Sequence, residues 1–240
     1  MRRFFAENID TTGDRVVLCG DEARHIAVVL RMRAGDRVLL IDGEGRECLS
    51  EIADCGEDRV ELCVIERRAS SAEPAVGVTL FQCLPKQGKM EVIIQKCVEL
   101  GIHEIVPTVS RRCIVKIDGK DNKLTRWNKV AQEAAKQCGR AFVPAVASPM
   151  RLDEINFEGF DIVLLAYENE SELTLKKVLR GLDKIPGSIA IVIGPEGGFE
   201  PVEAERIVNN GGVSVSLGKR ILRTETAGMA MLAQIMYEFD

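Results

Sequence analysis

The sequence predicts two folded domains, a small and mostly antiparallel β domain followed by a larger α/β domain. A chain of 240 residues, of which 46% are hydrophobic, can bury one large core or two smaller ones. Short strand patterns with tight turns fill the first part of the chain, whereas strand and helix patterns alternate in the rest. The small, polar, proline-ended segment from Arg67 to Pro74 separates the two patterns and is typical of a linker.

The first domain is expected within residues 1–70. Its strand candidates are rich in β-branched and aliphatic residues, and the last of them alternates polar and apolar positions. These candidates are Arg15–Cys19, Arg37–Ile41, Glu47–Ile52 and Arg59–Ile65. The turn Asp42-Gly43-Glu44-Gly45 indicates a hairpin between the second and the third. One helix is expected from Asp21, its N-cap, to about Leu30. Together these elements predict a small β barrel.

The second domain, residues 74–240, is expected to be an α/β layer structure. Its continuous apolar runs suit parallel strands that are covered on both faces. The strand candidates are Val76–Cys83, Glu104–Val109, Asp161–Ala166, Ile189–Ile193 and, more weakly, Val213–Leu217. Apolar residues at helical spacing predict a helix through Met90 and Val98 that Gly101 ends. A basic helix is expected from about Asp121 to Cys138, and a last helix through Leu232, Ile235, Met236 and Phe239.

Composition argues against several classes of protein. No stretch approaches the roughly 18 apolar residues of a membrane span, and the opening residues contain no signal-peptide core, so we expect a cytoplasmic protein without a membrane partner. None of the eight cysteines forms a pair at two-residue spacing, and only two histidines accompany them. We therefore expect no metal site and interpret the cysteines as reduced thiols.

The charge distribution points to an anionic partner. The net charge of −5 argues against general nucleic-acid binding, because neutralising phosphates requires Lys and Arg. One segment, residues 111–140, departs from this average with nine basic and three acidic residues, a local charge of +6. Its basic residues are Arg111, Arg112, Lys116, Lys120, Lys123, Arg126, Lys129, Lys136 and Arg140.

Two loops in the second domain are candidates for a ligand site. Residues 194–199 follow the strand candidate Ile189–Ile193, and residues 218–223 follow Val213–Leu217. Ligands of open parallel sheets bind beyond the carboxyl ends of the strands, where these loops lie. Their glycines allow a backbone to approach a ligand closely, although both loops are also compatible with simple tight turns. Neither GxGxxG nor GxxxxGK[ST] is present, which argues against a dinucleotide or nucleoside triphosphate.

The same loops resemble a known family. The run Gly194-Pro195-Glu196-Gly197-Gly198-Phe199, followed by Leu217-Gly218-Lys219-Arg220-Ile221-Leu222-Arg223-Thr224-Glu225-Thr226-Ala227, is similar to the signature of the 16S ribosomal RNA uridine-N3 methyltransferases, the RsmE-type branch of the SPOUT superfamily. Further similar segments occur in the same order from Arg2-Arg3-Phe4-Phe5, through Lys86 to Gly101, to Arg126-Trp127 and Arg140. The resemblance therefore covers nearly the whole chain.

The resemblance implies a fold and a function. It implies an N-terminal PUA-like RNA-binding β-barrel and a C-terminal SPOUT α/β domain with a deep trefoil knot. It also implies S-adenosylmethionine as cofactor, a homodimer, and a uridine of 16S rRNA in the small ribosomal subunit as substrate, without a metal. Two alternatives stay open at this point: a SPOUT enzyme that methylates a ribose 2′-oxygen, and a non-enzymatic RNA-binding factor in ribosome assembly.

Cofactor contacts are expected mostly from main-chain groups and aliphatic faces, because adenine is neutral and flat. The expected cofactor-binding residues are Leu165, Tyr167, Gly194, Glu196, Gly197, Gly198, Leu217, Gly218, Ile221 and Leu222. Glu168 is a candidate partner for the positive charge of the cofactor. Glu196 could serve in the same way, or it could be an exposed carboxylate near a helix start.

Methylation of uracil N3 requires loss of the N3 proton, which suggests two catalytic candidates. Arg223 would stabilise the negative charge that develops on the ring, and Glu225 would orient the base or accept the proton. An alternative for Glu225 is a first-turn carboxylate that the helix dipole favours.

RNA contacts are expected from basic residues of both domains. They are Arg2, Arg3, Arg24, Arg31, Lys86, Arg111, Arg112, Lys116, Arg126 and Arg140. Trp127 could stack on a base or could be packed against its own domain, and His25 is interpreted as structural.

Overall fold

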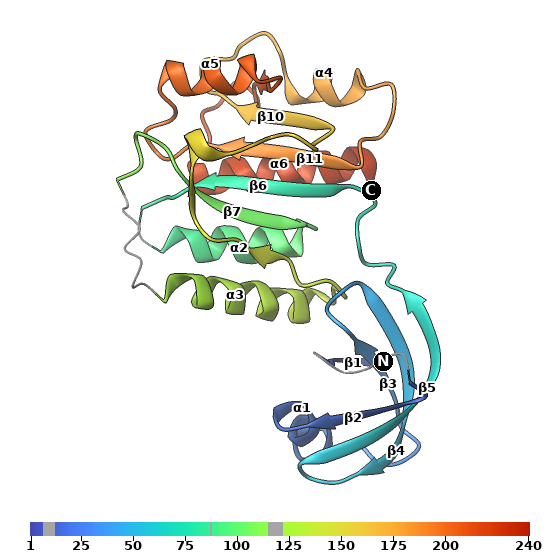
Figure 1. Ribbon diagram of the computed structural model, residues 1–240. Coiled ribbons are helices and arrows are strands. Elements are labelled where there is room, and N and C mark those ends of the chain that lie inside the picture. The colour runs from blue at the N-terminus through green and yellow to red at the C-terminus, as the bar shows by residue number, and fades with distance from the viewer. Residues whose placement is uncertain (7–12, 87, 115–121) are drawn as a thin grey trace. The chain divides into compact units, whose positions relative to one another are not determined.

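A computed structural model describes residues 1–6, 13–86, 88–114 and 122–240 (Figure 1). The chain forms two compact units, and each of them consists of two separate segments of the chain. Residues 1–73 and 135–143 make the first unit, and residues 74–134 and 144–240 make the second. The composition of the linker gave no sign that residues 135–143 return to the first unit. The predicted division of the chain into residues 1–70 and 74–240 stays a prediction. Among the described residues, no helix has the length and hydropathy needed to cross a membrane.

The first unit is built on one curled sheet in the order β1-β3-β4-β5-β2. Its strands are β1 (Arg2–Phe5), β2 (Arg15–Cys19), β3 (Arg37–Ile41), β4 (Arg46–Cys55) and β5 (Arg59–Ala69). β1 is parallel to β3, and the other pairs are antiparallel. β1 and β2 are the two edges and do not pair with each other within the described residues. The predicted barrel is therefore wrong in this respect: the sheet is a half-barrel that stays open.

The helical segment of the first unit has the predicted extent but differs from its prediction at the N-cap. It consists of α1 (Asp21–Arg24) and a π-helical turn, η1 (His25–Val29). Gly20, with a φ of 68°, occupies the N-cap position without a side-chain cap, so Asp21 is the first helical residue rather than the cap. His25 packs edge-on against Phe4, with ring centroids 6.0 Å apart, in agreement with a structural role.

A buried ion pair fastens residues 135–143 to the first unit. The Arg140 guanidinium donates from Nε and Nη2 to Glu73 Oε2 at 3.0 and 2.7 Å. The other Glu73 oxygen, Oε1, accepts the backbone N–H groups of Ala141 and Phe142 at 2.8 and 3.0 Å. Only 5% of the Arg140 side chain is exposed, so the pair is shielded from water.

The second unit is a parallel sheet with helices on both faces, in agreement with the predicted α/β layer structure. The strands are β6 (Gly77–Cys83), β7 (Glu104–Val109), β8 (Ala145–Val146), β9 (Met150–Arg151), β10 (Ile162–Ala166), β11 (Ser188–Ile193) and β12 (Val213–Val215). The helices are α2 (Lys89–Glu99), α3 (Lys123–Cys138), the 3-10 turn η2 (Leu152–Glu154), α4 (Leu175–Arg180), α5 (Pro201–Asn209) and α6 (Thr224–Phe239). The last residues of α3, from Ala135, belong to the first unit.

The strand order β12-β10-β11-β6-β7-β8, with β9 also paired to β7, brings the carboxyl ends of the strands to one edge (Figure 1). Two adjacent residues of β6 show which helices cover the sheet. Phe81 packs in one core with Ala204 and Ile207 of α5. Leu80, the residue before it, lies against Gly228 of α6. Successive strand residues point to opposite faces, so α5 and α6 cover opposite faces of the sheet. The loops that follow β10, β11 and β12 then lie at the shared edge between them.

Removing the carboxylate of the buried ion pair tests how residues 135–143 are held. We expect Glu73→Ala to lower the free energy of unfolding by about 3 kcal/mol, because it leaves a buried guanidinium and two backbone N–H groups without their acceptor. Urea denaturation measures this change. Glu99→Ala is the control, because Glu99 pairs with Lys96 in an i,i+3 contact worth about 0.5 kcal/mol or less. Equal losses in the two variants would contradict the structural role of the pair.

Candidate functional site

A cavity of about 570 Å³ lies at the carboxyl ends of β10, β11 and β12. Three segments form its walls, namely residues 166–170, 193–198 and 215–223, and Lys89, Thr224 and Ala227 complete it. The two glycine loops singled out in the sequence therefore meet around one space. The residues expected to bind a cofactor that line it are Tyr167, Gly194, Glu196, Gly197, Gly198, Leu217, Gly218, Ile221 and Leu222. Leu165 is fully buried in the core and is not among the described lining residues.

The glycines of the two loops have different tasks. Gly218 has a φ of 122°, and a Cβ built on it would meet nothing within 4 Å. Gly198 has a φ of 66°, and its Cβ would lie 2.0 Å from Glu168 Oε1. A Cβ on Gly194 would touch the Phe199 ring at 3.0 Å, so this position accommodates protein packing. Gly218 is therefore the glycine at which a side chain would most directly enter open space at the cavity.

Buried hydrogen bonds connect the two loops through Thr224. Its hydroxyl donates to the carbonyl oxygen of Gly194 at 2.6 Å and accepts from Gln82 Nε2 at 2.9 Å. Gln82 is fully buried near the end of β6 and also donates to the carbonyl oxygen of Cys83 at 3.0 Å. Sequence reasoning missed both residues, although an amide within the otherwise apolar end of β6 was a usable signal.

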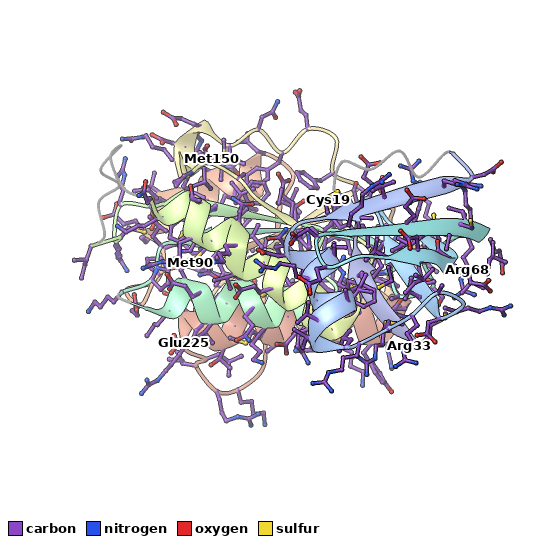
Figure 2. All side chains as sticks on the ribbon, turned by 90° about the horizontal axis from the view of Figure 1, so that it is seen from below. Cys19, Arg33, Arg68, Met90, Met150 and Glu225 are labelled. Carbon is purple, nitrogen blue, oxygen red and sulfur yellow. The ribbon has the colours of Figure 1, made fainter. Side chains whose placement is uncertain are left out.

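A lysine lies between two carboxylates at the side of the cavity. Lys89 Nζ lies 3.1 Å from Glu196 Oε1 and 3.0 Å from Glu225 Oε2. The backbone N–H of Lys86 also donates to Glu196 Oε1, at 3.0 Å. Figure 2 shows Glu225 on α6 and Met90, the neighbour of Lys89, on the adjoining helix α2. The contact therefore joins the first turns of two helices and the loop after β11.

This arrangement keeps all three groups charged. Burial favours the neutral form of Glu225, but its own backbone N–H, the Lys89 ammonium and the Arg223 charge outweigh burial and lower the pKa of its carboxyl. The pKa of Glu196 is lowered in the same way, against burial, by its own N–H, that of Lys86 and the Lys89 ammonium. Glu225 and then Glu196 raise the pKa of Lys89. Near neutral pH, Glu225 is thus an ionised carboxylate beside Arg223, which lines the cavity.

Several predicted RNA-binding residues surround the loop after β11. Arg112 Nη1 donates to the carbonyl oxygen of Gly197 at 2.8 Å, and Arg111 Nη1 donates to Glu200 Oε2 at 3.0 Å. Lys86 reaches the same loop through its backbone, as described above. All three side chains are exposed, and they lie beside the cavity rather than far from it.

The other predicted RNA-binding residues have varied settings. Arg2, Arg3, Arg24 and Arg31 are exposed on the first unit, and Arg126 is exposed on α3 and paired with Glu91. Lys116 lies outside the described residues. Arg140 is wrong as a surface residue, because it is 4% exposed and its guanidinium is bound to Glu73. Trp127 is 4% exposed and donates to Glu91 at 3.3 Å, which supports the packed interpretation.

Within the part of the chain that the structure describes, no group of three or more His, Cys, Asp or Glu side chains is placed to hold a metal ion.

Comparison with known proteins places both units in families of RNA-modifying enzymes. Residues 72–236 match a family described as an RNA methyltransferase domain, and residues 18–64 match an RNA methyltransferase PUA domain. A ribosomal RNA small subunit methyltransferase E from Bacillus subtilis is 37% identical over 231 residues, which cover 93% of this chain and 90% of the relative.

Two solved structures agree over almost the full length. The ribosomal RNA small subunit methyltransferase E from Neisseria gonorrhoeae, bound to S-adenosyl methionine, has a TM-score of 0.81 and 30% identity, covering 99% of this chain and 97% of that one. A methyltransferase described as putative in Legionella pneumophila, in complex with the same cofactor, has a TM-score of 0.80 and 29% identity, covering 98% and 96%.

These matches identify the type of domain that each unit forms. The first is a PUA-like sheet curled into a half-barrel, and the second is a parallel α/β methyltransferase domain. The chain therefore belongs to the ribosomal RNA small subunit methyltransferase E family, the RsmE-type branch of the SPOUT RNA methyltransferases that carries a PUA domain.

Proposed function

We propose that this protein transfers a methyl group from S-adenosylmethionine to N3 of a uridine in 16S rRNA of the small ribosomal subunit. One observation carries the proposal: both glycine loops, Lys89 and Arg223 line one cavity, and Glu225 pairs with Lys89 at its side. Family membership supports the broad activity, and relatives of this chain are named for the small-subunit ribosomal RNA. The N3 position on the uridine is what the resemblance to the uridine-N3 methyltransferases implies, and Arg223 and Glu225 are side chains that suit this chemistry.

The cavity fits S-adenosylmethionine in size and in lining. Its volume of about 570 Å³ lies in the usual range for small-molecule sites, about 300–1,000 Å³. Leu217, Ile221 and Leu222 offer aliphatic faces to an adenine ring, and the open space at Gly218 lets the backbone approach it. Glu168, Glu170 and Glu196 contribute carboxylates that suit the positive charge of the ligand, and the cations Lys89, Lys219, Arg220 and Arg223 line the same cavity. Tyr167, Gly194, Gly197 and Gly198 would complete the contacts, and Leu165 would support them from the core.

When bound, S-adenosylmethionine supplies an electrophilic methyl group on a sulfonium. The nucleophile is N3 of the uracil, and its lone pair is unavailable while N3 holds its proton, so the protein must help to remove that proton. Glu225, kept ionised by Lys89 at the side of the cavity, would accept that proton or orient the base. Arg223, at the cavity wall, would stabilise the negative charge left on the ring. The two side chains thus act on opposite charges of the same step.

The chain's second unit also supports a knot and a dimer. The hydrogen bond between Thr224 and Gly194 holds the segment after β12 against the loop after β11, a closeness that a deep C-terminal trefoil knot requires. Tyr237 on α6 and Val92 on α2 are 87% and 46% exposed, and these helices pack together. Exposed apolar side chains of this kind favour the homodimer that the family resemblance implies.

The proposal extends to the domains and the compartment. We assign residues 1–70 to RNA binding and residues 74–240 to methyl transfer. The exposed arginines of the first unit support its role in RNA binding. The protein would act in the cytoplasm, for which its eight free cysteines are suited.

Mapping the modified nucleoside tests the proposed reaction. Small ribosomal subunits that lack the modification are incubated with the protein and methyl-labelled S-adenosylmethionine, and the RNA is digested to nucleosides. We expect the label on N3 of one uridine. A label on a ribose would establish the 2′-O-methyltransferase alternative instead, and absence of any cofactor binding in calorimetry would favour a non-enzymatic factor.

A side chain at Gly218 should interfere with cofactor binding. Gly218→Val places methyl groups in the cavity, and overpacking of about 1–3 kcal/mol should weaken S-adenosylmethionine binding by about tenfold or more. Isothermal calorimetry measures the affinity. Gly159→Val is the matched control, because Gly159 also has a positive φ, 93°, and open space, but lies outside the cavity lining. Equal affinities in the two variants would show that Gly218 does not face the ligand.

Lys89 should set the pH dependence through Glu225. The lowered pKa of Glu225 keeps it ionised down to the ordinary glutamate value of about 4.3, so kcat/KM should show no carboxylate limb above about pH 5. Lys89→Met removes the ammonium, raises the pKa of Glu225 and should move the acid limb to higher pH. Glu225→Gln should lower kcat by about 10²-fold or more at all pH values. An unchanged pH profile in Lys89→Met would argue against Glu225 as proton acceptor.

A further inference from the structure

A second cavity, of about 320 Å³, lies outside the candidate active site. It is formed by the end of β7, the segment from Arg151 to Phe157, and α5, all within the second unit. Arg111, Arg151 and Arg206 lie on its walls, and we call it the arginine cavity. Nothing in the proposed methyl transfer uses it.

Three arginines line the arginine cavity, of which Arg111 also pairs with Glu200 and Arg151 lies 3.9 Å from Glu154. Two carboxylates, Asp153 and Glu203, also line it, but both already accept hydrogen bonds. Arg151 donates to both oxygens of Asp153 at 2.9 Å. Glu203 accepts the backbone N–H of Arg111 at 2.8 Å and that of Glu200 at 2.9 Å. Both carboxylates therefore have their charge partly compensated before a ligand arrives.

Arg206 contributes the charge least offset within this group. Its guanidinium donates to the backbone carbonyl oxygen of Asp153, a contact that satisfies a donor without neutralising the positive charge. The side chain is exposed on α5, at the edge of the arginine cavity. A phosphate could accept from the remaining guanidinium N–H groups, for which its geometry is suited.

An apolar wall is part of the same cavity. Ile155, Phe157 and Val202 line the arginine cavity, and Val202 is 49% exposed. Phe157 is half-buried and packs edge-on against Phe81, with ring centroids 5.3 Å apart. A flat apolar base against such side chains, with its phosphate on arginine, is the usual way in which proteins hold unpaired nucleotides.

The arginine cavity is joined to the candidate active site by a short path. Arg111 lines the arginine cavity, and the next residue, Arg112, donates to the carbonyl oxygen of Gly197, which lines the other cavity. Glu200 and Glu203 bind Arg111 from the first turn of α5, directly after the same loop. An RNA strand lying across residues 110–112 could therefore reach both cavities.

We propose that the arginine cavity binds one nucleotide of the substrate RNA other than the target uridine, with its base on the apolar wall and its phosphate on Arg206. This inference rests on the proposed function, because it assumes that the substrate is RNA. It adds a second anchoring point, which would hold a single-stranded segment while the target base occupies the active site.

Paired valine variants of α5 provide the main test. Val202→Glu puts a carboxylate at the mouth of the arginine cavity, whereas Val208→Glu adds the same charge at another exposed valine, 42% exposed, outside the cavity lining. The probe is a fluorescent single-stranded oligouridylate of about eight nucleotides, within the length range of single-strand sites. Fluorescence anisotropy measures its affinity. We expect about tenfold weaker binding for Val202→Glu and little change for Val208→Glu, because like charges repel the phosphate.

Arginine variants test the phosphate contact separately. Arg206→Ala should reduce the salt dependence of oligouridylate binding by about 0.7 in slope, the value for one phosphate contact on a single strand. Arg180→Ala, which removes an exposed arginine paired with Glu238 on another helix, should leave the slope unchanged. Thermal melting of each variant and calorimetry with S-adenosylmethionine verify that the fold and the active site persist.

The outcomes separate this inference from the proposed function, because the assay measures RNA binding without methyl transfer. Equal affinities for Val202→Glu and Val208→Glu, or an unchanged slope for Arg206→Ala, would overturn the nucleotide site. Free UMP that binds as tightly as the oligouridylate, with the same response to Val202→Glu, would overturn its assignment to an RNA strand. A methyl group found away from uridine N3 would refute the proposed reaction and leave a positive binding result intact.

Discussion

The Thr224 hydroxyl donates to the carbonyl oxygen of Gly194 and accepts from Gln82, and the geometry of the candidate active site depends on this buried contact. Hydrogen bonds shielded from water are expensive to break, because the groups left behind cannot be solvated. The contact fixes the first residue of α6 against the loop after β11. Glu225 is the next residue, so its pairing with Lys89 follows from the same anchor. The wall formed by residues 215–223 is held at its end in the same way.

Both cavities of the second unit are lined by charges of the two signs. Glu168, Glu170 and Glu196 line the larger one together with Lys89, Lys219, Arg220 and Arg223, and a cationic cofactor would find partial compensation at its carboxylates. Three arginines line the smaller one, where an RNA phosphate would be favoured. Lys89 and Arg223 stand at the larger cavity as cations beside Glu225, so a negative charge can also be stabilised at that side. A methyl transfer from a sulfonium to an anionic base requires both kinds of surface close together.

Arg140 illustrates why counting charges along the chain overestimates an RNA surface. It belongs to the most basic segment of the sequence, yet the fold buries it against Glu73 and uses it to hold residues 135–143. Gly194 shows that a glycine of a motif need not face a ligand. A Cβ at this position would meet the Phe199 ring rather than the open cavity. In both cases the residue type was informative, but its task depended on a neighbour distant in sequence.

Local patterns were enough to predict most strands and helices, the turn at Asp42-Gly43-Glu44-Gly45 and the two glycine loops, because each depends on residues close together in the chain. They failed for β1, for the short strands β8 and β9 and for α4, which are short and have little periodicity. Folding alone decided that the half-barrel stays open, that β11 lies between β10 and β6, and that Gln82 meets Thr224 across 142 positions. It likewise decided that Lys89 pairs with Glu225 and that three arginines surround a cavity. Such contacts arise when strands choose neighbours in a sheet, and that choice minimises the free energy of the whole core rather than of any one segment.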